Sequence, residues 1–76
     1  MENNKIDIGA ELERIKADIL DIEESGKNQS ILGFFKGSKN EREFIAAAGA
    51  FVKSRGYAAE FEYEDDELVL IIRKAA

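Results

Sequence analysis

The spacing of apolar residues changes at Gly56, and this change restricts the chain to a fold that combines helix and sheet. In two segments before Gly56, apolar residues recur every three or four positions, which is the period of one face of a helix. They include Ile8, Leu12, Ile15, Ile19 and Ile22. From Tyr57 to Tyr63 the period is two, with aromatic and small apolar residues at every second position, which is the period of a half-buried strand. We therefore expect a single α+β domain over residues 1–76.

The first helix is predicted over residues 6–25. Asn4 or Asp7 can accept a hydrogen bond from an early backbone N–H, and Gly26 stands where a left-handed residue ends a helix. The same spacing also fits a coiled coil, but two heptads fall short of the three or four that indicate one. We therefore expect this helix to pack against a second helix of the same chain.

Residues 27–40 connect the first helix to the next and contain an apolar run, Ile31–Phe35. We predict a short helical turn here that closes one end of the core, with Phe34 and Phe35 both buried, because large hydrophobic side chains are rarely left in water. The alternative is an exposed anchor for a partner or a membrane surface, since lysines flank the run. They are Lys27, Lys36 and Lys39.

A second helix is predicted from about residue 41 to residue 55. Two overlapping capping patterns mark its start: Ser38 with Glu41, and Asn40 with Glu43. Small residues fill its middle, from Ala46 to Ala50. Glycine lowers helix stability, so we expect Gly49 to lie where another element crosses closely.

Residues 57–64 and 68–73 are predicted to form a β-hairpin around the turn Asp65–Asp66. A two-residue turn sets the cross-strand pairs on each face. On the apolar face the pairs are Tyr63 with Leu68, Phe61 with Leu70, and Ala59 with Ile72; on the other face they are Glu62 with Val69 and Glu60 with Ile71. The predicted order is α-α-β-β, with two helices packed on one face of an antiparallel β-hairpin.

The residue types that are missing exclude most catalytic chemistry. The chain has no His, Cys, Trp or Pro, so it lacks imidazole acids and bases, thiol nucleophiles and the usual transition-metal ligands. We expect no catalytic residues, no metal and no cofactor. The absence of Cys, of a basic apolar leader and of a long apolar run leads us to expect a cytoplasmic protein that does not enter membranes.

Six acidic residues lie within eight positions at the hairpin, and the net charge of the chain is −5. They are Glu60, Glu62, Glu64, Asp65, Asp66 and Glu67. The spacing of a calcium-binding loop is absent, so we expect these acids to cover the solvent face of a strand. A rigid acidic hairpin could also attract a basic protein, or imitate phosphates as a small inhibitor of a nucleic-acid enzyme would.

The basic residues concentrate in the middle of the chain. They are Lys27, Lys36, Lys39, Arg42, Lys53 and Arg55. A basic surface on a helix followed by a hairpin suggests a winged-helix-like nucleic-acid module as an alternative function. The acidic hairpin and the overall negative charge argue against it, because phosphate binding needs a positive footprint.

The preferred function is that of a non-enzymatic protein-binding or assembly domain whose partner is another protein or a second copy of itself. Val69 and Ile71 lack obvious cover on the outer face of a two-stranded hairpin, beside Glu60 and Glu62. We predict a homodimer formed partly through this hairpin, in which Arg73 approaches the acidic strand of the other copy. Repulsion between two chains of charge −5 opposes it.

Overall fold

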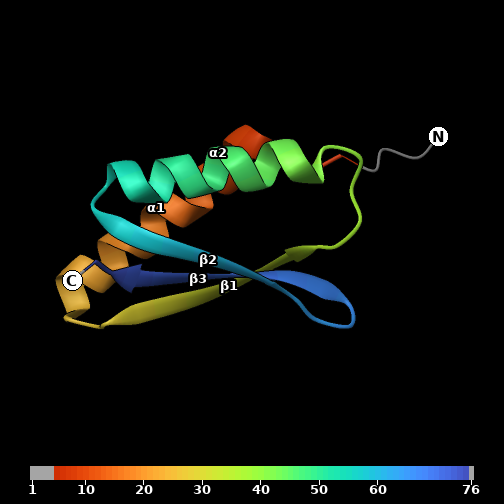
Figure 1. The fold of residues 1–76 in the computed structure, drawn as a ribbon. Coiled ribbons are helices and arrows are strands. Elements are labelled where there is room, and N and C mark those ends of the chain that lie inside the picture. Colours follow the sequence, from red (N-terminus) through yellow and green to blue (C-terminus); the bar gives the residue numbers. More distant parts are fainter. Residues whose placement is uncertain (1–4, 76) are drawn as a thin grey trace.

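Two helices and three strands make up the computed structural model, which describes residues 5–75. In chain order they are α1 (Ile8–Ser25), β1 (Gln29–Phe35), α2 (Glu41–Ser54), β2 (Tyr57–Tyr63) and β3 (Glu67–Lys74). The strands form one antiparallel sheet in the order β1-β3-β2, and both helices lie on one face of it (Figure 1). The predicted α+β class is confirmed, with α1 and α2 close to their predicted bounds.

The prediction of a helical turn between the two helices is wrong, because residues 29–35 form the strand β1. Alternate β1 side chains, from Ser30, Leu32 and Phe34, lie on the face of the sheet that carries the core. This alternation is the signature of a strand. The sheet therefore has three strands instead of two, and β3 is its centre.

The predicted burial of both phenylalanines holds for only one of them. Phe34 is 6% exposed and belongs to the core, whereas Phe35 is 83% exposed. Successive side chains of a strand point to opposite faces, so two adjacent phenylalanines on an edge strand cannot both enter the same core. In a helical turn, two adjacent phenylalanines could both have faced the core. The incorrect prediction of a helical turn therefore led to the incorrect prediction that Phe35 is buried.

The hairpin register is confirmed at each predicted pair. Tyr63 pairs with Leu68 and Phe61 with Leu70, and the amide of Glu64 donates to the carbonyl of Glu67 at 2.8 Å across the two-residue turn. One face of β3 is thus fully buried. It presents Leu68, Leu70 and Ile72 to the helices.

Both ends of α1 are stabilised by the residues that the sequence indicated. The side chain of Asp7 accepts a hydrogen bond from the amide of Ala10 at 3.2 Å, and Gly26 has a φ of +77° while its amide donates to the carbonyl of Ile22. The left-handed φ favours glycine because any other residue would bring its Cβ close to the backbone. The alternative cap, Asn4, lies outside the described residues.

The start of α2 is correctly predicted, but Asn40 does not cap it with its side chain. The side-chain amide of Asn40 instead forms two hydrogen bonds with the backbone of Ile6. Its Oδ1 accepts from the backbone N–H of Ile6 at 2.8 Å, and its Nδ2 donates to the carbonyl of Ile6 at 2.9 Å. Glu41 accepts from the amide of Gly37. The hydroxyl of Ser38 is buried and has no hydrogen-bond partner among residues 5–75. Asn40 therefore fastens the segment before α1 to the start of α2.

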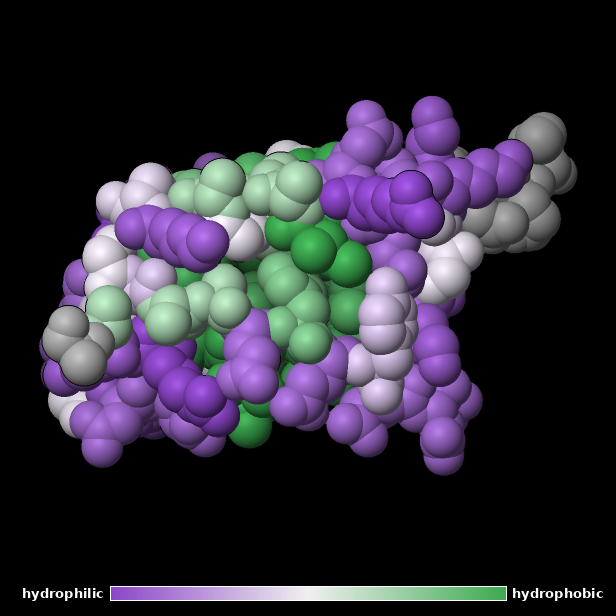
Figure 2. Space-filling view, viewed as in Figure 1, coloured by the Kyte–Doolittle hydropathy of each residue, from purple (hydrophilic) through white to green (hydrophobic). Residues whose placement is uncertain are grey.

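The core lies between the helices and the sheet, with Phe44 of α2 at its centre. The Phe44 ring packs edge-on against Phe34 at 4.9 Å and against Phe61 at 6.4 Å between ring centroids, so it joins β1 to β2. Figure 2 shows apolar side chains between α2 and β2, with polar side chains gathered along the lower border. Neither helix within residues 5–75 has the length and hydropathy needed to cross a membrane.

The prediction of a close crossing at Gly49 is also wrong. A Cβ placed on Gly49 meets no atom within 4 Å, and the residue is only partly buried. Ala48, one position earlier, is the small residue that the packing uses, since it is fully buried. Helical period places Gly49 about 100° away from Ala48, toward open space.

Candidate protein-interaction site at the edge of the sheet

The outer edge of β1 presents backbone groups that the sheet does not use. The carbonyl of Asn28 accepts from the amide of Lys74, so Asn28 faces β3. In an antiparallel pair, the N–H and C=O of one residue face the same neighbour, and successive residues alternate. The N–H and C=O groups of Ile31, Gly33 and Phe35 therefore point away from β3, toward the free edge.

The same edge carries the most exposed large hydrophobic side chains among the described residues. Phe35 is 83% exposed and Ile31 is 60% exposed. Exposed edges in natural proteins are commonly protected by charged residues or proline within the strand, because an open edge invites pairing. No charged residue or proline lies between Gln29 and Phe35. By that criterion β1 is an unprotected edge.

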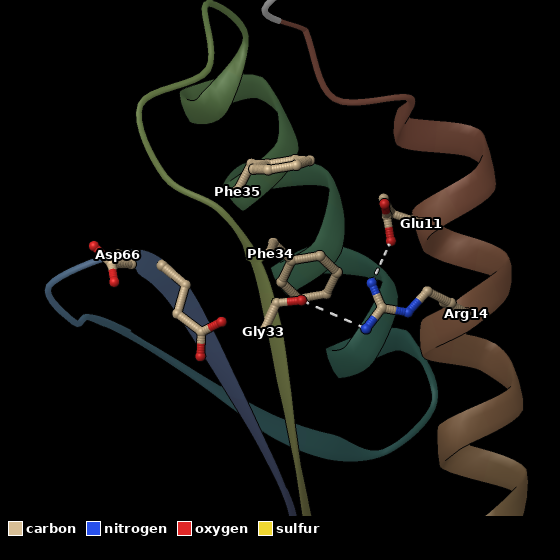
Figure 3. A pocket seen from close by; sticks show the side chains of 7 residues that line it. Glu11, Arg14, Gly33, Phe34, Phe35 and Asp66 are labelled. Carbon is tan, nitrogen blue, oxygen red and sulfur yellow. Dashed lines mark hydrogen bonds and ion pairs between the residues drawn. The ribbon is translucent and has the colours of Figure 1, made fainter.

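A hollow of about 300 Å³ lies at this edge, between the first half of α1 and the start of β3. Figure 3 shows Phe34 and Phe35 bordering it from β1, Glu11 and Arg14 from α1, and Asp66 from the turn before β3. Gly33 and Glu67 complete the lining. The hollow thus combines two aromatic rings, exposed backbone and four charged side chains.

Arg14 covers the helix side of the hollow. Its Nη1 donates to Glu11 Oε1 at 2.8 Å, its guanidinium lies 4.9 Å from the centre of the Phe34 ring, and its Nη2 donates to the carbonyl of Gly33 at 3.4 Å. The last distance is well beyond the usual 2.9 Å of such bonds, so this contact is weak. Arg14 therefore shields Phe34 firmly and the edge carbonyl only loosely.

Glu67 covers the opposite side of the hollow. A Cβ placed on Gly33 would lie 2.7 Å from Glu67 Oε2, so this carboxylate occupies the space that glycine leaves above the strand. Neither Glu67 nor Asp66 belongs to an ion pair within residues 5–75. Three carboxylates and one guanidinium line the hollow, which leaves an excess of two negative charges.

The residues predicted for self-association lie elsewhere, and the reason for choosing them does not hold. Val69 and Ile71 are only 9% and 8% exposed, because β3 is the central strand and both neighbours cover it. Arg73 pairs with Glu60 of its own chain at 2.9 Å. Glu62 is exposed beside Val69. Strand β3 therefore has no free edge for a second copy.

The six basic residues do not gather on one surface. Lys36, Lys39 and Arg42 lie at the start of α2, while the other three lie near the ends of α1 and α2. Arg42 and Lys53, the members of the two groups that lie on α2, are eleven residues apart, which is about 16 Å along the helix. Several bases also contact their own chain: Lys27 pairs with Asp21 at 3.0 Å, Lys36 donates to the carbonyls of Glu64 and Asp65, and Arg55 lies over Phe51.

Two tyrosines at the sheet margin bind carboxylates. The hydrogen bond of Tyr63 to Glu41, at 2.8 Å, is the main cause that raises the pKa of its phenol, and partial burial adds to it. Burial is the main cause that raises the pKa of Tyr57, followed by the charge of Glu23. The pKa of Lys27 is raised by its bond to Asp21. None of these groups lines the hollow, and residues 5–75 contain no group of three or more carboxylates placed to hold a metal ion.

Sequence reasoning missed Arg14 and Gly33 as candidate site residues, whereas Ile31 and Glu67 belonged to two alternatives, an exposed apolar anchor and an acidic hairpin that attracts a basic protein. The available signal was the alternation of residues 30–35, in which the core positions Ser30, Leu32 and Phe34 interleave with the edge positions Ile31, Gly33 and Phe35. Comparison of the chain with protein families, with curated proteins and with solved structures finds no match.

Proposed function

We propose that this protein is a non-enzymatic protein-binding domain that recognises its partner through the outer edge of β1. The observation that carries the proposal is the unprotected edge, where Ile31 and Phe35 are largely exposed on a strand without an internal charge. Large exposed hydrophobic side chains beside unpaired backbone groups are costly to maintain, because they promote aggregation. A binding partner that covers them accounts for their presence.

The acidic residues near this edge favour a partner with a basic surface. Asp66 and Glu67 lie at the hollow, whereas Glu62 and Glu64 are exposed on the other arm of the hairpin, beyond β3. Charge complementarity of this kind mainly speeds association and excludes acidic competitors. A small acidic inhibitor of a nucleic-acid enzyme, which binds the enzyme and not the nucleic acid, is one protein of this class.

Self-association remains a prediction, and the sheet order restricts the edges through which two sheets could pair. Because β3 is central, a homodimer would have to join its sheets through β1 or β2. Ile31 and Phe35 flank Gly33 symmetrically, so two β1 strands related by a twofold axis would place each Ile31 opposite the Phe35 of the other copy. Repulsion between two chains of charge −5 works against this pairing.

The nucleic-acid alternative has less support. The exposed residues of α2 include Arg42 and Lys53 but also Glu43, and the turn that would act as the wing is Asp65–Asp66. Nucleic-acid affinity that depends on phosphate contacts falls steeply with salt. We expect no binding to random duplex DNA at low salt, measured by fluorescence anisotropy. Salt-sensitive binding in the micromolar range would favour the alternative instead.

Site-specific photocrosslinking tests the proposed function. Phe35 is replaced by the photoreactive p-benzoylphenylalanine and the protein is irradiated in a lysate of the cells that produce it. Leu20, which is 44% exposed on α1, receives the same replacement as a matched control. We expect a discrete protein adduct from position 35 that position 20 does not give.

Competition decides whether the adduct is specific. Excess unlabelled protein should abolish it, whereas excess of the variant Ile31→Lys/Phe35→Lys should not. An adduct of twice the chain mass would identify a second copy as the partner. Equal labelling from both positions, or no adduct from position 35, would contradict the proposal.

A further inference from the structure

We infer that the partner binds as an additional antiparallel β-strand on the edge of β1, with a lysine or arginine opposite Gly33. This inference rests on the proposed function and specifies how the partner is recognised. Three features of the hollow determine the recognition: the outward backbone groups of β1, the lack of a side chain at Gly33, and the carboxylate of Glu67 that lies over Gly33.

The backbone of β1 is ready for another strand. Ile31, Gly33 and Phe35 offer their N–H and C=O groups at the spacing that an antiparallel neighbour needs. Within residues 5–75, one of these six groups has a partner: the Gly33 carbonyl, whose 3.4 Å contact with Arg14 is long. Arg14 keeps its bond to Glu11 and its place over Phe34 when the edge carbonyl accepts from a new strand instead.

The charge of the hollow selects the central residue of the added strand. A residue directly opposite Gly33 has its Cβ about 5 Å from the Gly33 position, on the same face of the sheet. Gly33 has no side chain there, and Glu67 Oε2 already lies over it. A basic side chain can extend across this gap and form an ion pair with Glu67, with Asp66 close by.

The exposed hydrophobic residues select the positions on either side. Ile31 and Phe35 are two residues before and after Gly33, so their cross-strand partners are two residues from the basic residue. Apolar side chains at those positions would cover the exposed surfaces of Ile31 and Phe35, which are 60% and 83% exposed. The expected recognition sequence is apolar–x–Lys/Arg–x–apolar. A second copy that pairs through its own β1 does not supply it, because β1 contains no basic residue.

Short synthetic peptides test the inference without an identified partner. The probe is acetyl-Ser-Val-Ser-Arg-Ser-Val-Ser-amide, titrated into ¹⁵N-labelled protein and followed by NMR. We expect shifts of the Ile31, Gly33 and Phe35 amides and slower exchange of their protons. A peptide with Glu in place of Arg should bind about tenfold more weakly, as should the probe with the variant Glu67→Gln.

Backbone methylation separates strand addition from simple adhesion. N-methylation of the central Arg removes the N–H that faces Gly33 and should abolish binding, whereas N-methylation of an adjacent Ser, whose N–H faces solvent, should not. In the protein, Ile31→Pro removes an outward N–H of β1, while the groups that bond to β3 come from Ser30, Leu32 and Phe34; Ile31→Ala controls for the lost side chain. Ala59→Pro makes the same change at the outer edge of β2 and should bind the probe normally.

The outcomes distinguish this inference from the proposed function. Equal affinity of the Arg and Glu peptides, or shifts confined to other residues, would overturn the inference while the crosslinking result stands. Edge amides that are already protected in the free protein, together with a dimer by sedimentation, would also overturn it and place a second copy on β1. Absence of a crosslinked partner would instead count against the proposed function itself.

Discussion

At the scale of single residues, Phe34 and Phe35 offer a direct comparison of adjacent positions. Phe34→Ala removes a buried ring that packs against Phe44, and we expect a loss of about 3–5 kcal/mol in the free energy of unfolding. Phe35→Ala should change it by less than about 0.5 kcal/mol, because the ring is exposed. Urea denaturation of both variants measures the difference, and similar losses would contradict the assignment of Phe35 to the surface.

Two glycines should respond to alanine in opposite directions. Gly49→Ala should stabilise the protein by about 0.5–1 kcal/mol, because a Cβ meets nothing within 4 Å and alanine favours the helix. Gly26→Ala should destabilise it by about 1 kcal/mol, because the φ of +77° disfavours any side chain. Thermal unfolding followed by circular dichroism compares them. A destabilised Gly49→Ala variant would restore the close crossing predicted from the sequence.

The bonds of Tyr57 and Tyr63 to glutamates predict a loss of stability at high pH. Both phenols have a pKa raised above the ordinary value of 10.0, so the folded state favours the neutral form. The contribution of these two phenols to the free energy of unfolding is complete below pH 10, and it disappears as the pH rises through their raised pKa. We expect the double variant Tyr57→Phe/Tyr63→Phe to show a flatter decline between about pH 9 and pH 12. Denaturant titrations at several pH values measure this decline. If the free energy of unfolding falls equally steeply with pH in both proteins, the result would argue against these bonds.

At the scale of secondary-structure elements, Asn40 connects the segment before α1 to the start of α2. Asn40→Ala removes both hydrogen bonds to Ile6, and we expect a loss of about 1–2 kcal/mol. Faster hydrogen exchange of the Ile6 amide is the specific sign, because a general loss of stability would affect the core amides equally. Asn28→Ala is the control, since Asn28 contributes a backbone carbonyl to the sheet and is otherwise exposed. An unchanged Ile6 exchange rate in Asn40→Ala would show that the contact is not formed.

The elements that the sequence predicted correctly are those with long, regular patterns. The repeat from Ile8 to Ile22 and the alternation from Tyr57 to Tyr63 each offer one strong period, and the two-residue turn left one register for the hairpin. β1 was missed because its period is hidden. The outward positions of β1 carry no polar residue: Gly33 has no side chain, and Ile31 and Phe35 are apolar. Residues 31–35 therefore form a continuous apolar run in the sequence.

The candidate site could not be predicted because it joins residues from three elements. Arg14 belongs to α1, Gly33 to β1 and Glu67 to β3, and only the sheet order brings them together. In a two-stranded sheet Val69 and Ile71 would be exposed, and the predicted self-association site depends on that exposure. Pairing of β1 with β3 over seven residue pairs covers them and moves the free edge to β1.

At the scale of the whole molecule, the two halves of the sheet close chain loops of very different length. β2 and β3 are joined by a two-residue turn, whereas Gln29 of β1 pairs with Arg73. Closing the longer loop costs more entropy, so we expect the hairpin to form before β1 adds to it. Phe61→Ala in β2 should mainly slow refolding, and Leu32→Ala in β1 should mainly speed unfolding. Stopped-flow kinetics tests this order, and slower refolding of Leu32→Ala would reverse it.

The position of β3 between two strands that precede it also matters during synthesis. Translation produces β1 and β2 first, and neither has a neighbour to pair with until β3 leaves the ribosome. During that interval Leu32 and Phe34 lack their sheet partners, so the nascent chain exposes more apolar surface than the native protein does. In the same interval β1 is open to pairing along both of its sides, and only the arrival of β3 closes one side and brings Glu67 to the other.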